Sequence, residues 1–313
     1  MPITGKTKLL GVIGDPVEHS LSPAMHNAAI AHLGLDYVYL PFPIQKENLA
    51  RALDGFAAIA LVGFNITIPH KQAIIPLLAE VSPVAQAIGA VNTVWRSEKG
   101  WEGTNTDAIG FIAPLRELEC NWRKITPVIL GNGGAARAVV AGCVELGCSE
   151  IRVVGRDRGK LDKFKLSWQD TPFAGAVRVH LWDELPTLVS ETQLLVNSTP
   201  VGMSPHVDRS PLDEATLKQL PVGAIAYDLI YTPSPTRFLQ LAKKCGAMAI
   251  DGSEMLVQQG AAALGLWLQQ PIPAQIMRQA LLENLQSRIE GKKEIGEEKV
   301  IGEERNEQNS VSR

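Results

Sequence analysis

Short apolar runs alternate with amphipathic segments along most of the chain. Apolar runs that stop at glycine, proline or asparagine predict buried strands, and longer segments with a helical period predict helices. In the first half, the pattern predicts strands at residues 9–13, 37–41, 58–63, 90–95 and 101–103. It predicts helices at residues 22–35, 47–53, 72–79 and 83–87. This alternation is typical of an α/β layer.

The second half repeats the alternation with more regular spacing. Its predicted strands are residues 127–130, 151–154, 177–181, 194–197, 224–228 and 247–250. Helices are predicted between them and at residues 109–118, 254–270 and 273–287. We therefore predict an α/β protein with two domains and a cleft between them: an N-terminal substrate-binding and catalytic domain (1–107 plus 255–287) and a Rossmann-type dinucleotide-binding domain (108–254). Residues 288–313 are rich in charge and are predicted to be a disordered tail.

A glycine-rich turn lies between the strand at 127–130 and the Ala/Val-rich helix after it. Gly131, Gly133 and Ala136 fit the pattern G-x-G-x-x-[G/A] in the strand–helix context that a dinucleotide site requires. Glycines let the backbone approach a pyrophosphate, and the helix N-terminus offers free N–H groups. An ordinary tight turn is the alternative, and the βαβ context favours the nucleotide site.

The end of the next strand bears on the choice of nucleotide. An NAD site expects Asp or Glu there, but this chain has Gly155 and Arg156, with Arg158 and Lys160 just beyond. A guanidinium can pair with a 2′-phosphate, and each charge-assisted hydrogen bond contributes about 1.5–3 kcal/mol. We therefore predict NADP. NAD is the alternative cofactor, since the Asp157 carboxylate could bind a ribose hydroxyl instead.

Composition narrows the class of protein. The chain has 313 residues, 45% of them apolar, and a net charge of −3, so nothing suggests a nucleic-acid or membrane-surface partner. The longest apolar runs are too short for a signal peptide or a membrane span. The four cysteines lack C-x-x-C spacing and are interpreted as buried residues in a reducing compartment. We expect a cytoplasmic monomer or homodimer that acts on a small molecule.

Candidate catalytic groups follow two predicted strands of the first half. Lys71 and Asp107 both stand where α/β sheets place their ligands, and a lysine beside a carboxylate can donate a proton to an oxygen that gains charge. A surface ion pair is the competing interpretation of each residue alone. Hydroxyl and amide groups suited to a polyhydroxylated acid occur at Ser20, Ser22, Asn65, Thr67, Asn92, Asn105 and Gln259. The histidines lack ligand spacing, and no metal is expected.

Taken together, these motifs resemble the shikimate dehydrogenase family, from residue 10 to about residue 284. The matching stretches are Ser20-Leu21-Ser22-Pro23, Asn65-Ile66-Thr67-Ile68-Pro69-His70-Lys71, Gly89-Ala90-Val91-Asn92-Thr93, Gly103-Thr104-Asn105-Thr106-Asp107, Gly131-Asn132-Gly133-Gly134-Ala135, Asn197-Ser198-Thr199-Pro200, Tyr227-Asp228 with Tyr231, and Asp251-Gly252 with Met255 and Gln259. The family reduces 3-dehydroshikimate to shikimate with NADPH, in the pathway to chorismate and the aromatic amino acids.

The resemblance implies a role for each matched residue. Lys71 would be the acid/base at the 3-hydroxyl, with Asp107 as its partner, and Ser20 and Ser22 would hold the substrate carboxylate. The substrate hydroxyls would be bound by Thr67, Asn92, Asp107, Tyr231 and Gln259. The pyrophosphate would lie on Gly131, Asn132, Gly133, Gly134 and Ala135. The 2′-phosphate would meet Arg156, with Arg158 and Lys160 nearby, and the nicotinamide would lie against Leu229, Gly252 and Met255.

Two departures keep other functions open. The family often has Asn-Arg-Thr where this chain has Gly155-Arg156-Asp157, and its serine after the glycine turn is Ala136 here. A quinate/shikimate dehydrogenase that uses NAD is therefore an alternative. Two further alternatives are a non-catalytic nucleotide sensor with the same fold and another two-domain Rossmann reductase. The latter would not explain the set formed by Ser20, Ser22 and Gln259.

Overall fold

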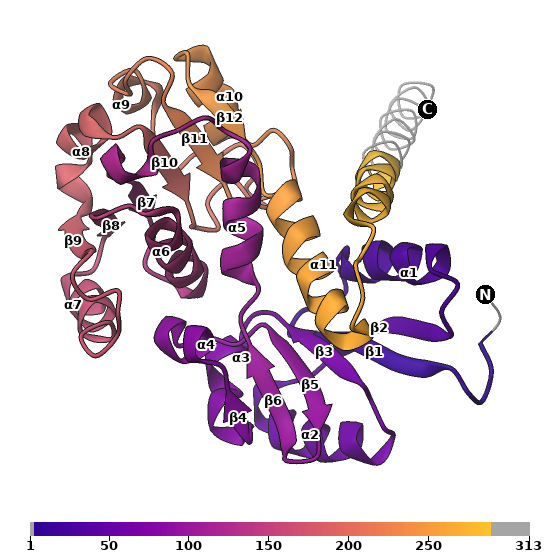
Figure 1. The fold of residues 1–313 in the computed structure, drawn as a ribbon. Helices are drawn as coiled ribbons and strands as arrows, with labels where there is room; N and C mark the ends of the chain where they lie inside the picture. The colour runs from indigo at the N-terminus through magenta and orange to yellow at the C-terminus, as the bar shows by residue number, and fades with distance from the viewer. Residues whose placement is uncertain (1–2, 289–313) are drawn as a thin grey trace, which may run out of the picture.

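The computed structural model describes residues 3–288, which form two six-stranded sheets connected by long helices (Figure 1). The first sheet has the order β2-β1-β3-β5-β6-β4. In it β1 runs parallel to β2 and β3, while β5 runs antiparallel to β3 and β6. Its strands are β1 (Lys8–Gly14), β2 (Tyr37–Pro43), β3 (Gly63–Ile66), β4 (Glu80–Val81), β5 (Thr93–Ser97) and β6 (Gly100–Thr104).

The second sheet is parallel throughout and has the order β12-β11-β10-β7-β8-β9. This is the order of a dinucleotide-binding fold, and the direction of winding reverses between β7 and β10. Proteins of this fold bind their ligands beyond the carboxyl ends of the two strands at that reversal. Its strands are β7 (Val128–Leu130), β8 (Ile151–Gly155), β9 (Val177–Leu181), β10 (Leu194–Asn197), β11 (Ile225–Asp228) and β12 (Met248–Ile250).

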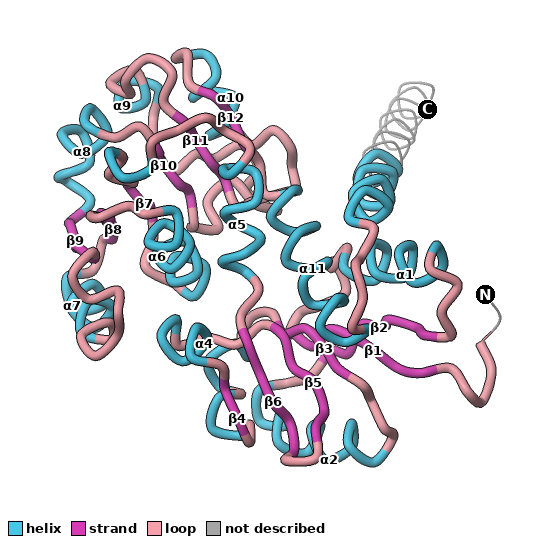
Figure 2. Tube along the Cα trace, in the orientation of Figure 1, coloured by secondary structure: helices cyan, strands magenta, loops and turns pink. Residues whose placement is uncertain are grey.

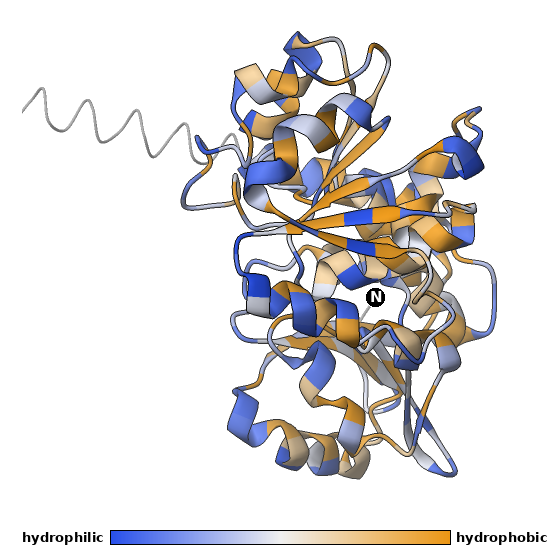
Figure 3. Cartoon of the chain, turned by 90° about the vertical axis from the view of Figure 1, so that its left-hand side faces the viewer, coloured by the Kyte–Doolittle hydropathy of each residue, from blue (hydrophilic) through white to orange (hydrophobic). Residues whose placement is uncertain are grey.

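Helices cover the second sheet because parallel strands are buried on both faces. Every residue of β7 and β10 is buried, and Figure 3 shows the apolar colour concentrated along the strands. The helices are α1 (Ser22–His32), α2 (Leu49–Ala58), α3 (His70–Ala73), α4 (Pro83–Ile88), α5 (Asp107–Arg116), α6 (Gly134–Leu146), α7 (Arg158–Leu166), α8 (Leu185–Glu191), α9 (Glu214–Leu217), α10 (Arg237–Lys244) and α11 (Ser253–Leu268).

Two helices, α5 and α11, pack against each other between the sheets (Figures 1 and 2). Phe111 of α5 belongs to the core under the second sheet, where it stacks on Tyr227 of β11 with ring centroids 5.1 Å apart. Trp267 of α11 packs under the first sheet, and its indole nitrogen donates to the carbonyl of Val94 at 3.0 Å. The pair of helices therefore fixes one sheet relative to the other.

A last helix, residues 274–288, returns alongside α1 and α11. Met277 and Leu281 are fully buried in the core that these helices share. Arg278 adds a two-pronged ion pair to Glu254 in the first turn of α11, with contacts of 2.6 and 2.7 Å. Burial and charge together hold the start of this helix in place.

The structure confirms the α/β fold with its two sheets and corrects several local predictions. Residues 58–63 were predicted as a strand, but α2 continues to Ala58 and β3 begins only at Gly63, because an alanine-rich apolar run fits either period. The helix predicted at 72–79 breaks near Pro76 into α3 and a 3₁₀ turn, Ile75–Leu77, before the short strand β4.

The predicted domain boundaries stay a prediction. All strands of the first sheet come before residue 107 in the chain, and all strands of the second sheet come after it. The predicted tail begins at residue 288, which still belongs to the last helix, and its remainder lies outside the described residues. Cys143 and Cys148 are buried as expected, but Cys120 and Cys245 are only half-buried; all four thiols are free. Within residues 3–288, no helix is both long and apolar enough to cross a membrane.

Candidate active site

Lys71 and Asp107 meet at the edge of the first sheet. Lys71 lies in α3, directly after the loop that follows β3, and Asp107 is the first residue of α5. The Lys71 Nζ donates to Asp107 Oδ2 at 2.5 Å, although 36 residues separate them along the chain. Their side chains are 23% and 10% exposed, so the pair is mostly buried but still in contact with solvent.

The other carboxylate oxygen of Asp107 is held by Asn92. Asn92 Nδ2 donates to Asp107 Oδ1 at 2.8 Å, and Asn92 Oδ1 accepts from the backbone N–H of Thr106 at 2.8 Å. The backbone N–H of Asp107 donates to Asn105 Oδ1 at 2.9 Å. These bonds fix the direction of the carboxylate and, through it, the position of the Lys71 ammonium.

Gln259 brings α11 into the same polar cluster. Its Oε1 accepts from Asn92 Nδ2 at 3.3 Å, and its Nε2 donates to the carbonyl of Leu256 at 2.9 Å. Gln259 is only 8% exposed. The structure therefore brings together four of the residues predicted from the sequence: Lys71, Asn92, Asp107 and Gln259.

Ser20 and Ser22 lie together at the start of α1. The backbone N–H of Ser22 donates to Ser20 Oγ at 3.3 Å, and the Ser22 side chain is largely buried. Burial raises the pKa of Tyr39, and a hydrogen bond with Ser22 opposes that shift. The Tyr39 hydroxyl donates to Asn65 Oδ1 at 2.7 Å. A chain of neutral polar groups therefore leads from α1 to the end of β3.

Thr67 and Tyr231, two further residues predicted to bind substrate, lie in the loops after β3 and β11. Thr67 follows β3, is half-buried, and its backbone N–H donates to the carbonyl of Ile13 at 2.9 Å, next to the end of β1. Tyr231 is half-buried in the loop after β11 and packs against the core shared by α1 and α11. Burial raises the pKa of Tyr231, which keeps its hydroxyl a neutral donor.

The glycine turn has the shape of an anion site. Gly131 has φ +98°, and a Cβ there would lie 3.0 Å from Thr199 Cγ2. Gly133 and Gly134 face open space, where a Cβ would meet no atom within 4 Å. No side chain caps α6, so its first N–H groups, including that of Ala135, are open to a bound anion. Asn132 is half-buried in the same turn.

The basic residues after β8 have distinct surroundings. The Arg156 guanidinium lies over the Trp182 ring, 4.8 Å from its centroid, and Arg158 pairs with Asp162 one helical turn away at 3.1 Å. Asp157 Oδ1 accepts from the backbone N–H of Lys160 at 2.9 Å and so caps α7. The Asp157 carboxylate, which in the sequence analysis made NAD an alternative cofactor, is therefore engaged in a helix cap.

Leu229 and Gly252 touch through their backbones at the far end of the second sheet. A Cβ on Gly252 would lie 2.1 Å from the Leu229 carbonyl oxygen, so only glycine fits. The Gly252 N–H donates to the carbonyl of Ile230 at 3.1 Å. Met255, in the first turn of α11, packs against the core of the second sheet. These three predicted residues lie where the β11 loop meets α11.

Asp228 is a buried group to which the sequence analysis gave no role. Its Oδ1 accepts from Asn197 Nδ2 at 3.0 Å and from the Ile230 N–H at 3.1 Å, and its Oδ2 accepts from the Thr236 hydroxyl at 2.6 Å. It closes the loop that carries Leu229 and Tyr231. Polar residues at the ends of two successive buried strands, Asn197 and Asp228, were the signal that could have revealed it.

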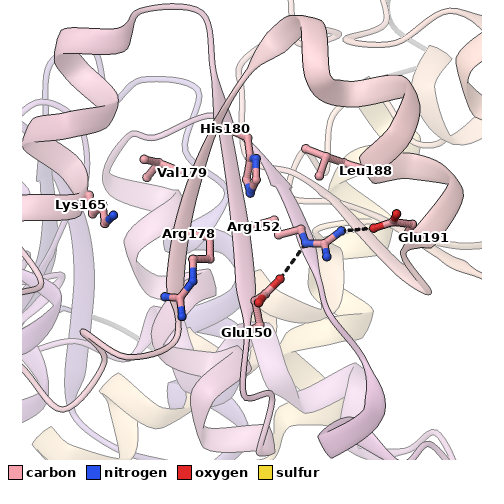
Figure 4. A pocket seen from close by; sticks show the side chains of 8 residues that line it. All are labelled: Glu150, Arg152, Lys165, Arg178, Val179, His180, Leu188 and Glu191. Carbon is pink, nitrogen blue, oxygen red and sulfur yellow. Dashed lines mark hydrogen bonds and ion pairs between the residues drawn. The ribbon is translucent and has the colours of Figure 1, made fainter.

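A separate hollow of about 380 Å³ opens at the β8–β9 edge of the second sheet (Figure 4). Its charges largely offset one another, since Arg152 bonds to Glu150 at 2.9 Å and to Glu191 at 2.5 Å. No residue predicted for the site lines it. In the described part of the chain, no cluster of His, Cys, Asp and Glu could hold a metal ion.

Comparison with known proteins identifies the family. Residues 12–94 match the model of the shikimate dehydrogenase substrate binding domain, and residues 252–282 match that of the shikimate 5′-dehydrogenase C-terminal domain. The chain is 63% identical over 283 residues to the shikimate dehydrogenase (NADP(+)) of Gloeothece citriformis, covering 90% of this chain and 98% of that protein. The chain belongs to the shikimate dehydrogenase family. The resemblance seen in the sequence is confirmed.

Solved structures agree on the fold. A crystal structure of a shikimate dehydrogenase in complex with NADP+ superimposes with a TM-score of 0.83 at 37% identity, covering 91% of this chain and 98% of that one. The ligand-free 5-ketofructose reductase of a Gluconobacter strain has a TM-score of 0.78 at 32% identity, covering 90% and 99%. A reductase named for a different substrate thus has the same architecture. The fold alone therefore does not determine the substrate, which depends on the residues of the site.

The buried carboxyl of Asp228 predicts a pH effect on stability. Burial raises the pKa of Asp228 from 3.8 to about 6. A raised pKa adds stability that is fully present below pH 4 and is lost as pH rises through about 6. The free energy of unfolding of the wild type minus that of Asp228→Asn should therefore fall by about 3 kcal/mol between about pH 3 and pH 7, a range that brackets both pKa values. Denaturant unfolding at a series of pH values measures it.

Asp213 supplies a control of opposite sign. It is an exposed cap of α9, and hydrogen bonding from Thr216 lowers its pKa. Its contribution is present above its usual pKa and is lost as pH falls, so the corresponding difference for Asp213→Asn should rise with pH. A difference for Asp228→Asn that is flat, or that rises with pH, would contradict the burial argument.

Proposed function

We propose that this protein is an NADP-dependent shikimate dehydrogenase, which reduces 3-dehydroshikimate reversibly to shikimate on the route to chorismate and the aromatic amino acids. Its family membership confirms the predicted enzyme class and the predicted cofactor. The observation that carries the proposal for this chain is the Lys71–Asp107 contact of 2.5 Å within a cluster of amides and hydroxyls. We assign the protein to the cytoplasm.

The Lys71–Asp107 pair suits proton transfer to a carbonyl oxygen. When bound, NADPH supplies the hydride that forms the new C–H bond at C3 of the substrate. The C3 oxygen gains the electron pair of the C=O π bond, and the Lys71 ammonium donates a proton to it, forming the hydroxyl. Asp107 holds the ammonium in place through Oδ2, and Lys71 regains its proton from water. In the reverse direction, neutral Lys71 accepts the hydroxyl proton.

The remaining polar groups suit a small ring with one carboxylate and several hydroxyls. Such a ring offers little apolar area, so discrimination comes from hydrogen bonds whose loss leaves buried polar groups unpaired. The hydroxyls of Ser20 and Ser22 bind the carboxylate in this proposal. The ring hydroxyls are bound by Thr67, Asn92, Asp107, Tyr231 and Gln259. The contacts among Asn92, Asp107 and Gln259 support a shared role for those three.

The cofactor site follows from the second sheet. The uncapped start of α6 would hold the pyrophosphate, on Gly131, Asn132, Gly133, Gly134 and Ala135. Arg156 would pair with the 2′-phosphate, and Arg158 and Lys160 would add positive potential there. Leu229, Gly252 and Met255 would line the nicotinamide site. The cap formed by Asp157 supports NADP, because a carboxylate engaged with the backbone of α7 is less able to bind a ribose hydroxyl.

Three alternatives remain to be separated by assay. A quinate/shikimate dehydrogenase would oxidise quinate, another Rossmann reductase such as one for 5-ketofructose would prefer its own substrate, and a nucleotide sensor would turn over nothing. We expect the absorbance of reduced nicotinamide to rise with shikimate and NADP+, and far more slowly with quinate or with NAD+. Turnover of quinate or 5-ketofructose at a higher kcat/KM than shikimate would refute the proposal.

Replacing the proton donor should lower turnover. Lys71→Ala removes the ammonium that stabilises charge on the C3 oxygen, so kcat should fall by about 10²- to 10⁴-fold, while KM for shikimate changes little. Steady-state kinetics on the purified variant measure both constants. Lys99→Ala is the matched control, because Lys99 pairs with Glu80 on an exposed surface. A Lys71 variant with full turnover would disprove the assignment.

Replacing Arg156 should weaken binding of the phosphorylated cofactor selectively. Arg156→Ala removes the guanidinium over Trp182, so KM for NADPH should rise tenfold or more while KM for NADH stays nearly constant. Kinetics with each cofactor at saturating 3-dehydroshikimate measure the two values. Arg116→Ala, which removes an exposed partner of Glu145, is the control. Equal changes for NADPH and NADH would contradict the role of Arg156.

A further inference from the structure

The last described residue contacts the loop that carries the serine pair. Arg288 Nη1 donates to the carbonyl oxygen of His19 at 3.1 Å, although the two residues are 269 positions apart. The sequence pattern had assigned residue 288 to the charged tail. In the structure it is instead the end of the helix formed by residues 274–288.

The position of Arg288 follows from how this helix is anchored. Met277 and Leu281 are fully buried between α1 and α11, and Arg278 is paired with Glu254 by two hydrogen bonds. Ten residues of helix then separate Arg278 from Arg288, a rise of about 15 Å. The helix therefore carries Arg288 away from the Glu254 end and up to the loop before α1.

The guanidinium of Arg288 lies next to one part of the proposed substrate site and acts electrostatically on another. The His19 carbonyl that it contacts belongs to the peptide bond of Ser20, whose Oγ accepts from the Ser22 N–H. Burial raises the pKa of Tyr231, and the charge of Arg288 opposes that shift. Arg288 thus lies beside the loop that carries the serine pair, and its positive charge also acts on the tyrosine.

A nearby cation would strengthen the binding of a substrate carboxylate that the two serine hydroxyls hold. Hydroxyl groups provide neutral hydrogen bonds, and moving a carboxylate out of water into a partly buried site costs free energy unless positive charge compensates. The Lys71 ammonium is engaged by Asp107 at 2.5 Å. We propose that Arg288 is a specificity-determining residue of this active site, which attracts and holds the carboxylate of the substrate from the rim of the serine-pair loop. This inference rests on the proposed function.

Because Arg288 is exposed, we expect its substitution to change the KM for shikimate only modestly. A pair of charges at a solvent-exposed rim changes affinity by about two- to fivefold and is screened by salt. Arg288→Gln should raise KM for shikimate by about that factor with kcat unchanged, and Arg288→Glu should raise it further because the charge is reversed. Arg288→Lys should restore most of the wild-type KM.

The decisive comparison removes the charge from the substrate. KM is measured for shikimate and for its uncharged methyl ester, with saturating NADP+, on wild type, Arg288→Gln and the control Arg51→Gln, which alters an exposed arginine of α2. We expect the Arg288 effect with shikimate to disappear with the ester. Between about 20 mM and 300 mM salt, the wild-type KM for shikimate should rise more than that of Arg288→Gln. Thermal unfolding of each variant checks that the fold is intact.

Each other outcome counts against the inference. An unchanged KM for shikimate in Arg288→Gln would refute it. An equal loss with acid and ester would show that the residue only supports the structure of the loop. A wild-type protein that turns over neither compound would refute the proposed function itself, and is recognised before any variant is compared.

Discussion

The side chain of Asn92 is the centre on which the proposed active site depends. It is 2% exposed, and its amide bonds to the Asp107 carboxylate, to the Gln259 amide and to the backbone of Thr106. A buried amide that loses a partner costs about 1–3 kcal/mol, so the bonds restrain one another. The direction of the Asp107 carboxylate, and with it the location of the Lys71 ammonium, follows from this restraint.

The same helices that hold the sheets together also carry two residues of the proposed active site. Asp107 opens α5, whose Phe111 stacks on Tyr227 of the second sheet, and Gln259 belongs to α11, which begins beside Leu229. Since α5 and α11 pack against each other, the separation between Asp107, which holds the Lys71 ammonium, and Met255 of the proposed nicotinamide site is set by helix packing. The packing of α5 against α11 therefore determines both the arrangement of the two sheets and the position of Asp107.

Helices, strands and candidate site residues were easier to predict from the sequence than the contacts between those residues. The glycine turn at Gly131 was predictable because its backbone requirement is local, and the second sheet because most of its strands are short apolar runs. The Lys71–Asp107 contact was not, because pattern and spacing do not measure a distance across 36 residues; only the family resemblance supplied it. The cap formed by Asp157 and the contact of Arg288 with His19 likewise depend on tertiary geometry.

The central claim is that Lys71 delivers a proton to the substrate oxygen at C3. A crystal structure of the protein with NADP+ and shikimate bound tests it most directly. We expect Lys71 Nζ to lie within about 2.6–3.2 Å of the C3 hydroxyl oxygen, with Asp107 still bonded to the ammonium. Shikimate bound with its C3 hydroxyl against another group, and with Lys71 pointing away from it, would contradict the account.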